Sequence, residues 1–424
     1  MKNKTKETLL NIRSYILAFL CWAIISITLG SVCGVVGSGF SRAISFGIGL
    51  RQEHGWLLYF LPLAGILSVL TYKLLRVTDI GTNRIIESAR DNSKVPLLLA
   101  PAIFTGTVIS HTFGASAGKE GAALQLGGSI SSLFCRIFRF GEKTKHILTM
   151  CGMAALFSSL FGAPLGASVF AIEVASVGYI CSAAIFPCLV SGISAYLVSD
   201  ALGTQTENFT LSLVPQLNMD TLWRVAVIGI AGALVSILFC KALHLTEGFA
   251  KKFLKNDFLR IVAGGGILVL LPFILRTTEY NGGGMDTIIH VFEQGEVKYE
   301  AFALKILFTA ITVAAGFKGG EIVPTMFIGA TLGGSLASLL GLDVAFGAAV
   351  GIAALFCGVT NCPLGTLVLC TELFGSSGMI FFALSLIISF LLSGKVSLYS
   401  KQHFVFSKLN DEKTDNESSN EPCA

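Results

Sequence analysis

Residues 151–174 read CGMAALFSSLFGAPLGASVFAIEV, and residues 350–373 read VGIAALFCGVTNCPLGTLVLCTEL. The two stretches align without a gap and share ten of 24 residues, among them one proline and one glutamate. Just upstream, LGGSISSL at 126–133 is echoed by LGGSLASL at 332–339, with a short insertion between. Apolar residues often agree by chance, but a helix-breaking residue and an acidic one do not. The chain is therefore predicted to contain two duplicated halves.

The composition is that of an integral membrane protein. The 424 residues are 53% hydrophobic and 13% charged, with a mean hydropathy of +0.75, whereas soluble domains carry about 25% charged residues. The 46 glycines suit closely packed membrane helices. A large soluble core would need helices with polar faces, and most segments lack them. The formal net charge of +4 is small, so it calls for no nucleic-acid partner.

The apolar stretches differ in length. A bilayer core about 30 Å thick needs ~20 helical residues. Long membrane helices are predicted at 15–36, 56–75, 97–114, 225–243, 261–275 with its flanks, and 301–317. Shorter helices, broken by glycine or proline, are predicted at 118–134, 146–161, 164–179, 323–340, 345–358 and 363–374. Such half-length helices are tolerated at membrane depth only where they are buried in protein or line a cavity.

The ends of the chain and the link between the halves are polar. Lysines at positions 2, 4 and 6 favour a cytoplasmic N-terminus. We expect the link to lie within 204–218, and we expect residence in the plasma membrane. The predicted divisions are a cytoplasmic basic segment (1–8), a first membrane half (9–205), a second membrane half (219–405) and a polar, disordered C-terminal tail (406–424).

Broken helices at corresponding places in two halves indicate transport, with a site at the repeat interface near the bilayer midplane. Ionisable residues inside apolar runs are costly and are functional candidates. Four glutamates qualify: Glu120, Glu173, Glu321 and Glu372. Glu173 and Glu372 each lie nine residues after the repeated proline. We expect these two to cap or bridge helices rather than to handle ions.

Glu120 and Glu321 lie instead in glycine-framed breaks, GKEG at 118–121 and GGEIVP at 319–324, each followed by a predicted helix. A helix start presents free backbone N–H groups and the positive end of the helix dipole, which together bind anions. Glycine lets the backbone approach a bare ion closely. The residues predicted to form an anion site from these breaks are Gly118, Lys119, Gly121, Ile322 and Val323.

Glu120 is the predicted gate. When ionised, its carboxylate can occupy the anion site, and when protonated or displaced it vacates the site. Burial and a nearby anion both favour its neutral form, so one group serves as gate and proton acceptor. The alternative is that Glu120 only caps a helix and pairs with Lys119.

Several of these motifs resemble those of the CLC chloride channel and transporter family. GKEG followed by AALQLGG resembles the gating-glutamate motif, with Ala122 in place of the usual proline. GGEIVP resembles the GGxFxP motif at the second helix start. SLYS at 397–400 is similar to the region whose tyrosine donates its hydroxyl to the central anion, which implies that role for Tyr399. The alternative for Tyr399 is a place in the interfacial aromatic belt.

The chain also departs from that family. Its GSGIP segment, whose serine contacts the central anion, is replaced by TDIGTN at 78–83, where Thr82 or Asn83 is the candidate. Val174 stands where chloride-type exchangers carry an inner proton-transfer glutamate. Glu321 resembles the glutamate that serves proton movement in the fluoride/proton antiporter branch. Val323 is apolar where that branch has a polar residue, so the resemblance leaves chloride and fluoride both open.

The resemblance implies an all-α multi-pass membrane protein with an inverted repeat of two halves, many broken or tilted helices, and a homodimeric assembly in membrane lipid. It implies transport of halide, chloride or fluoride, in exchange for protons, with Glu120 as gate and Glu321 as a second proton-handling carboxylate. One alternative is a passive, voltage-gated type of chloride channel, favoured by Val174 and the altered serine motif. A second is a membrane sensor or structural protein that binds an anion without transporting it.

No cofactor, metal or enzymatic activity is expected. The eleven cysteines are scattered and none has CxxC spacing. The stretch GASAGK at 114–119 is one residue too short for a phosphate-binding loop and is followed by glutamate instead of Ser or Thr. An HExxH motif is absent from the sequence.

Overall fold

The structure of the protein is a computed structural model. It describes residues 2–77, 81–91, 93, 95–206, 209, 211, 213–405 and 408; for 2–12 and 143 it describes the backbone alone. The first three residues of the TDIGTN stretch therefore lie outside the described residues. So does the tail predicted to be disordered, except for residue 408.

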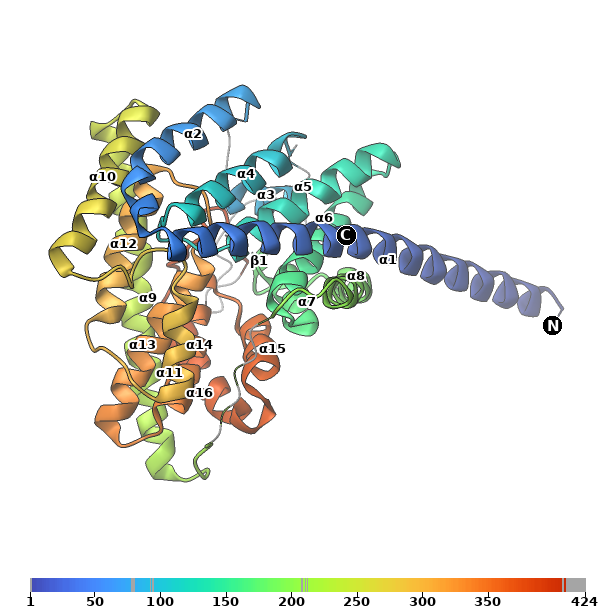
Figure 1. Cartoon of the computed structure of the whole chain (residues 1–424). Coiled ribbons are helices and arrows are strands. Elements are labelled where there is room, and N and C mark those ends of the chain that lie inside the picture. The colour runs from blue at the N-terminus through green and yellow to red at the C-terminus, as the bar shows by residue number, and fades with distance from the viewer. Residues whose placement is uncertain are drawn as a thin grey trace.

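Sixteen α-helices make up most of the described chain (Figure 1). The first eight are α1 (Lys2–Glu53), α2 (Leu61–Leu74), α3 (Thr82–Asp91), α4 (Leu99–Thr112), α5 (Glu120–Ile137), α6 (Glu142–Phe161), α7 (Pro164–Glu173) and α8 (Ser182–Ala201). The second eight are α9 (Met219–Phe253), α10 (Asp257–Leu275), α11 (Met285–Gln294), α12 (Ala301–Ala315), α13 (Ile322–Leu340), α14 (Val344–Thr360), α15 (Pro363–Phe374) and α16 (Met379–Leu392). Short elements between them are η1 (Gly55–Phe60), η2 (Ser376–Gly378) and the parallel strands β1 (Ser176–Val177) and β2 (His403–Phe404).

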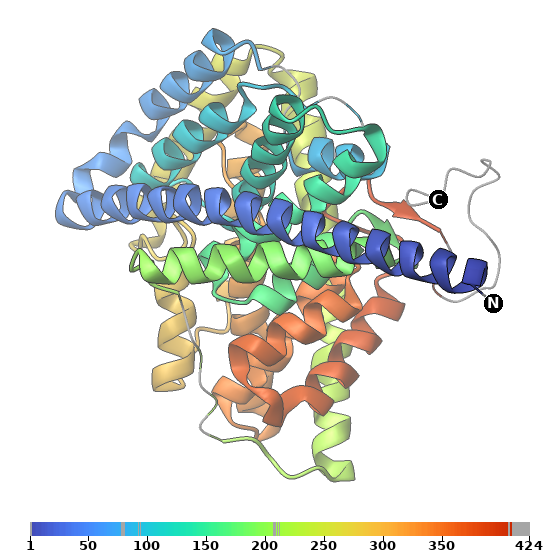
Figure 2. The same ribbon diagram turned by 90° about the vertical axis from the view of Figure 1, so that its right-hand side faces the viewer.

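The two sets of eight helices pack in the same pattern. Within the first set α5 packs on α6, α1 on α8 and α2 on α4, and within the second set α13 packs on α14, α9 on α16 and α10 on α12. Figure 2 shows α1 and α8 side by side across one face. Three pairs that join the sets are α2 with α10, α5 with α13 and α7 with α15. Each of these pairs joins a helix to its own counterpart, which places a pseudo-twofold axis between the halves.

Glycines set the closest packing within each half. A Cβ atom on Gly127 would lie 2.1 Å from the carbonyl oxygen of Gly152, and one on Gly351 would lie 2.2 Å from the carbonyl oxygen of Gly329. These contacts make Gly127 the counterpart of Gly329. The sequence alignment of LGGSISSL with LGGSLASL instead pairs Gly127 with Gly333, which is wrong by one helical turn. Small residues recur every four positions on these faces, so the sequence match slides by a turn without losing its pattern.

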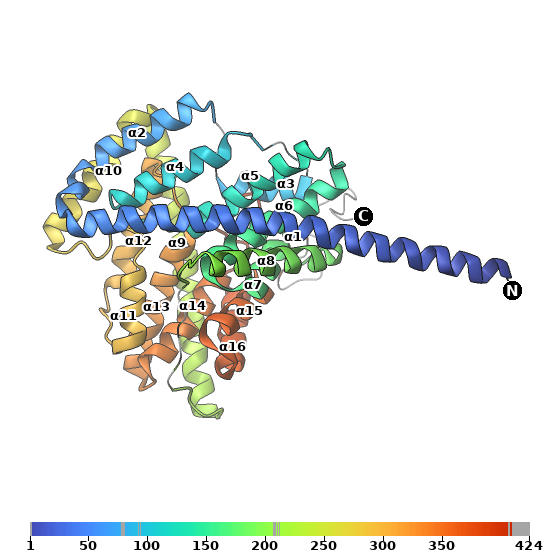
Figure 3. The same ribbon diagram turned by 45° about the vertical axis from the view of Figure 1, so that its right-hand side comes forward.

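Six described helices or helical segments are long and apolar enough to cross a membrane. They span Arg13–Glu53, Gly55–Leu74, Ser182–Ala201, Met219–Phe253, Asp257–Leu275 and Ile322–Leu340. The helices predicted at 15–36 and 225–243 are confirmed but continue much further, because α1 has 52 residues and α9 has 35. Since about 20 residues cross a bilayer, helices of this length must tilt or project from it. Figure 3 shows the N-terminal part of α1 extending beyond the other helices.

Other expected spans are corrected. The segments at 97–114 and 301–317 were expected to be long helices, but α4 ends at Thr112 after 14 residues and α12 ends at Ala315 after 15. Each is followed by a loop that leads to a glycine-framed break. Helices α8 and α16 are as apolar as the predicted spans but were not predicted.

Glu173 and Glu372 cap each other's helices across the halves. The Glu173 carboxylate accepts hydrogen bonds from the N–H groups of Leu364 (3.3 Å) and Gly365 (2.7 Å) at the start of α15. The Glu372 carboxylate accepts them from Leu165 (3.0 Å) and Gly166 (2.6 Å) at the start of α7. The structural role expected of both glutamates is confirmed.

Replacing Glu173 by alanine is expected to lower the thermal stability of the protein, because two buried N–H groups of α15 lose a charged acceptor. A hydrogen bond to a charged group contributes roughly 1.5–3 kcal/mol, so the Tm of detergent-solubilised protein should fall by several degrees. E173Q, which keeps one acceptor oxygen, should lose less. E247Q is the control, since Glu247 makes only an exposed pair with Lys251. An unchanged Tm in E173A would contradict the capping role.

Candidate functional site

The two glycine-framed breaks meet at the pseudo-twofold axis. The N–H of Gly118 donates to the carbonyl oxygen of Gly320, and the N–H of Gly320 donates to that of Gly118, both at 2.7 Å. This antiparallel bridge holds the residue pairs that precede α5 and α13 side by side. The breaks predicted to share a site are therefore in direct contact and are buried within the protein.

Only glycine fits at this junction. A Cβ atom on Gly320 would lie 2.3 Å from the backbone nitrogen of Gly121, and one on Gly121 would lie 2.6 Å from the Cα of Gly320. Real Cβ atoms do not approach backbone so closely, so a side chain at either position would force the two helix starts apart. We call the paired residues Gly118 and Gly320 the glycine junction.

Two helix N-termini converge on the glycine junction. Lys119 is the N-cap residue of α5 and Glu321 is the N-cap residue of α13. Neither N-cap side chain accepts a hydrogen bond from its own helix. The N–H groups of the first turns, which include those of Gly121, Ile322 and Val323, thus lack the usual side-chain cap and carry the positive end of each dipole.

A cavity of about 830 Å³ reaches the glycine junction on one side, and we call it the Glu120 vestibule. Glu120 lines it and is only 2% exposed. Its Oε2 lies 2.8 Å from the position that a Cβ on Gly118 would take, so the carboxylate is folded against the junction. Lys119 also lines this cavity, and its Nζ donates to Ser41 Oγ at 3.5 Å. Val323 completes the wall beside Glu120.

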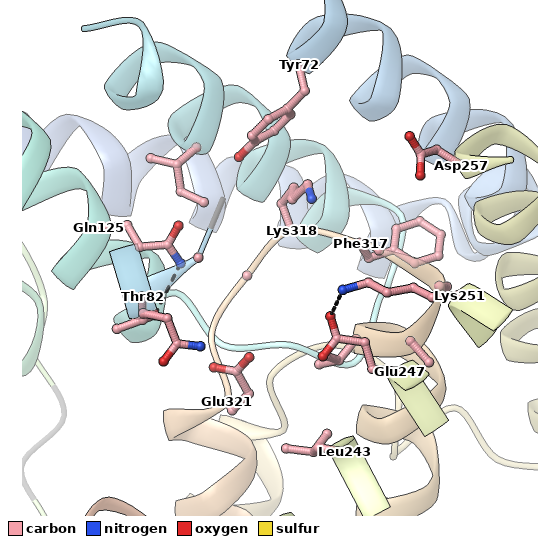
Figure 4. Close-up of a pocket in the computed structure, with 18 of the residues that line it drawn as sticks. Tyr72, Thr82, Gln125, Leu243, Glu247, Lys251, Asp257, Phe317, Lys318 and Glu321 are labelled. Carbon is pink, nitrogen blue, oxygen red and sulfur yellow. Dashed lines mark hydrogen bonds and ion pairs between the residues drawn. The ribbon is translucent and has the colours of Figure 1, made fainter. Parts of the chain in front are cut away.

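A second cavity, of about 840 Å³, is lined by Gly319 and Glu321, which flank Gly320 of the junction, and we call it the Glu321 vestibule (Figure 4). Glu321 lines it, as do Tyr399, Thr82 and Asn83. Figure 4 shows the Glu321 side chain projecting into the cavity toward the start of α3. The structure therefore brings the predicted residues together around one junction, with Glu120 and Glu321 on separate sides of it.

Tyr399 is buried with its hydroxyl unused. The residue is 3% exposed, and its Oη has no hydrogen-bond partner among the described residues. Gln402 fixes this segment, because its Nε2 donates to the carbonyl oxygens of Thr360 (2.7 Å) and Val174 (3.1 Å). A buried donor that faces a cavity without an acceptor is suited to a bound anion. This placement opposes the alternative of an interfacial belt tyrosine.

Thr82 and Asn83 both face the Glu321 vestibule at the start of α3. Thr82 Oγ1 accepts a hydrogen bond from Gln125 Nε2 at 3.3 Å. Asn83 Oδ1 accepts one from the N–H of Lys401 at 3.2 Å, which ties α3 to the segment that carries Tyr399. The structure places both candidates at the site and does not single out one of them.

Three further residues of the Glu321 vestibule were not predicted: Gln125, Tyr72 and Lys318. Gln125 had a signal in the sequence, because it is the one carboxamide in the apolar run of α5. Tyr72 lies in a segment interpreted only as a membrane helix. Lys318 precedes the second glycine-framed break and was passed over beside Glu321.

The two vestibules open at equivalent ends of the two halves. Arg51, near the C-terminal end of α1, lines the Glu120 vestibule, and Lys251, near the C-terminal end of α9, lines the Glu321 vestibule. The C-terminal ends of α1 and α9 therefore lie at different vestibules, although the two helices are counterparts. The halves are thus inverted with respect to each other.

Known proteins share this sequence pattern and architecture. The family model described as voltage gated chloride channel matches residues 63–394. A protein named "Chloride/fluoride channel protein" from Pseudomonas syringae pv. tomato is 34% identical over 395 residues, which cover 91% of this chain and 87% of that protein. One named "H(+)/Cl(-) exchange transporter ClcA" from Vibrio campbellii is 25% identical over 376 residues, which cover 81% and 80%.

Solved structures agree. The crystal structure of a CLC-type fluoride/proton antiporter matches with a TM-score of 0.87 at 30% identity, covering 91% of this chain and 98% of that one. A slow cyanobacterial Cl-/H+ antiporter matches with a TM-score of 0.76 at 19% identity, covering 88% and 94%, which supports the fold alone. The expected all-α, multi-pass fold is confirmed. The chain belongs to the voltage gated chloride channel (CLC) family, whose members are ion channels and transporters rather than a class of enzymes.

Proposed function

We propose that the protein moves a halide across the membrane in exchange for protons, with Glu120 as the gate. The observation that carries this proposal is the position of Glu120, a buried carboxylate folded against the glycine junction where two vestibules meet. Uncapped helix N-termini attract an anion to the same place. A carboxylate and a halide thus compete for one set of donors.

The anion seat has donors from both sides of the glycine junction. The N–H groups at the starts of α5 and α13 face it from the backbone, and the Tyr399 hydroxyl is available from the Glu321 vestibule. Ionised Glu120 mimics the anion and closes the seat. Protonation removes its charge, so the side chain can leave toward the Glu120 vestibule and the halide takes its place.

Glu321 is proposed as the second proton-handling carboxylate. Glu173, beside the position where chloride-type exchangers carry their inner glutamate, is already used as a helix cap. Val174 cannot carry a proton. Glu321 lines the vestibule opposite Glu120, so protons entering there have a carboxylate close to the junction.

We propose fluoride as the halide, with chloride as the competing substrate in the tests. The relative at 34% identity is named as a chloride/fluoride channel, and the structure with the higher TM-score is a CLC-type fluoride/proton antiporter. Glu321 is also the residue in which this chain resembles that branch.

We propose that the protein lies in the plasma membrane with its N-terminus inside the cell. The Glu321 vestibule then faces the cytoplasm, which agrees with the basic residues along it, Lys73, Arg76, Lys251, Arg260 and Lys318. Exposed apolar side chains such as Phe273 (76%) and Leu234 (63%) would contact lipid. By similarity to the family we also propose that the protein is a homodimer. We propose that residues 9–205 and 219–405 form its two membrane halves.

Flux coupling tests the proposed function directly. In liposomes that contain the wild-type protein, an inward fluoride gradient should drive protons outward against their own gradient. The measurement records external pH while fluoride is followed with an electrode, and chloride is tested in parallel. Halide flux without uphill proton movement would favour the passive channel. No flux of either halide would favour a protein that only binds an anion.

Replacing Glu120 by glutamine is expected to abolish halide-driven proton movement, because an amide cannot bind and release the proton. General acid–base groups commonly contribute 10²-fold or more, so coupled proton flux should fall to background. Halide passage should continue at an altered rate, since the amide no longer competes as an anion. The control is E247Q, because Glu247 also lines the Glu321 vestibule and its carboxylate forms an ion pair with Lys251. Normal proton pumping by E120Q would refute the mechanism.

A further inference from the structure

Lys318 holds a constrained position between the end of α12 and the glycine junction. Its backbone N–H donates to Ser110 Oγ of α4 at 3.1 Å. Its side chain crosses α4 at Gly106, where an added Cβ would lie 3.0 Å from Lys318 Cγ and 2.8 Å from Tyr72 Cε2. The Lys318 ammonium then lies 4.7 Å from the centroid of the Tyr72 ring. Figure 4 shows both side chains on the same wall of the Glu321 vestibule.

The Lys318 ammonium forms no ion pair with a described carboxylate, although Asp257 and Glu247 lie near enough to act on it electrostatically. Among the described residues, neither a hydrogen bond nor an ion pair engages its Nζ. Two other cations of this vestibule are paired, Lys251 with Glu247 at 2.6 Å and Arg260 with Asp257 at 2.7 Å. An ammonium held among apolar helices is costly unless an anion or water compensates it. Among the described residues, Lys318 is thus a positive charge close to the junction that no carboxylate contacts directly.

The Tyr72 hydroxyl is a second unused donor. The residue is 4% exposed, and its Oη has no hydrogen-bond partner among the described residues. An ammonium offers only donors, and a phenol can offer one. The two groups share a wall of one cavity, and neither donates a hydrogen bond to a described residue. Unused donors side by side are the chemistry that recognises a small anion.

We propose that Lys318 and Tyr72 form a second halide-binding position in the Glu321 vestibule. It holds the ion through side-chain donors before the ion passes to the seat at the glycine junction. This inference rests on the proposed halide transport. It assigns to Lys318 a role in setting the affinity for halide in the Glu321 vestibule. The ring of Tyr72 orients the ammonium through a cation–π contact, and the cavity supplies the remaining water ligands.

Replacing Lys318 by glutamine should raise the halide concentration for half-maximal flux about tenfold, since charge-assisted hydrogen bonds are roughly twice as strong as neutral ones. K318R keeps the charge and should stay within about threefold of wild type. Y72F should raise the half-maximal concentration a few-fold. The measurement is the initial rate of flux into proteoliposomes at stepped sodium fluoride and sodium chloride. Calorimetric titration of the same salts onto solubilised protein should show the same weakening in K318Q.

K73Q is the matched control. Lys73 also lines the Glu321 vestibule and also lies over a ring, that of Phe258 at 4.3 Å, but it is exposed. Its loss should change the half-maximal concentration less than about twofold, and that change should vanish when non-halide salt screens surface charge. Equal effects of K73Q and K318Q would overturn the proposal, because general vestibule charge would then explain both.

One outcome is that the wild type transports halide while K318Q shows the same half-maximal concentration and the same halide binding. That result would refute the proposed halide position at Lys318 and leave the proposed function standing. Absence of halide transport in the wild type would refute the proposed function itself. Gel filtration in detergent checks that each variant folds. Should K318Q fail that check, Y72F decides the question, and its unchanged affinity would count against the position.

Discussion

Two reciprocal hydrogen bonds between Gly118 and Gly320 set the geometry on which the rest of the site depends. They bring two chain breaks from separate halves into contact at backbone distance, which leaves no room for a side chain at Gly121 or Gly320. Because each break is followed at once by a helix, the contact directs two helix N-termini at one place. The proposed anion site rests on that arrangement of backbone N–H groups.

The duplicated halves share their architecture but differ in chemistry. The repeated glutamates, Glu173 and Glu372, keep symmetric roles, since each caps the opposite half's short helix. The residues next to the glycine junction are not symmetric. The N-cap position is Lys119 in one half and Glu321 in the other, and the carboxylate proposed as the gate, Glu120, occurs in one half alone. A symmetric frame thus carries different groups in its two vestibules.

Much of the fold and of the candidate site could be predicted from the sequence, because glycine, proline and glutamate inside apolar runs have few roles. The repeat, the two breaks and the capping function of Glu173 followed from such residues. Helix ends were predicted less well, since apolar composition continues through α8 and past the ends of the predicted spans. The register of Gly127 was missed because small residues recur at every turn.

Lys318 and Tyr72 escaped prediction for another reason. They lie far apart in sequence, and only their crossing over Gly106 brings the ammonium onto the ring. No local sequence pattern predicts such a crossing. Tyr399 was found only through a resemblance, since a tyrosine near the end of an apolar run has several ordinary explanations.

In the proposed function, the glycine junction separates two vestibules that open on opposite faces of the membrane. Gln52, at the end of α1, lines the Glu120 vestibule, and Lys251, at the end of α9, lines the Glu321 vestibule; both are exposed. The direct measurement is labelling of Q52C and K251C by a membrane-impermeant maleimide in intact and permeabilised cells. The account predicts that Q52C is labelled in intact cells and K251C only after permeabilisation. Labelling of both from the same side would contradict it.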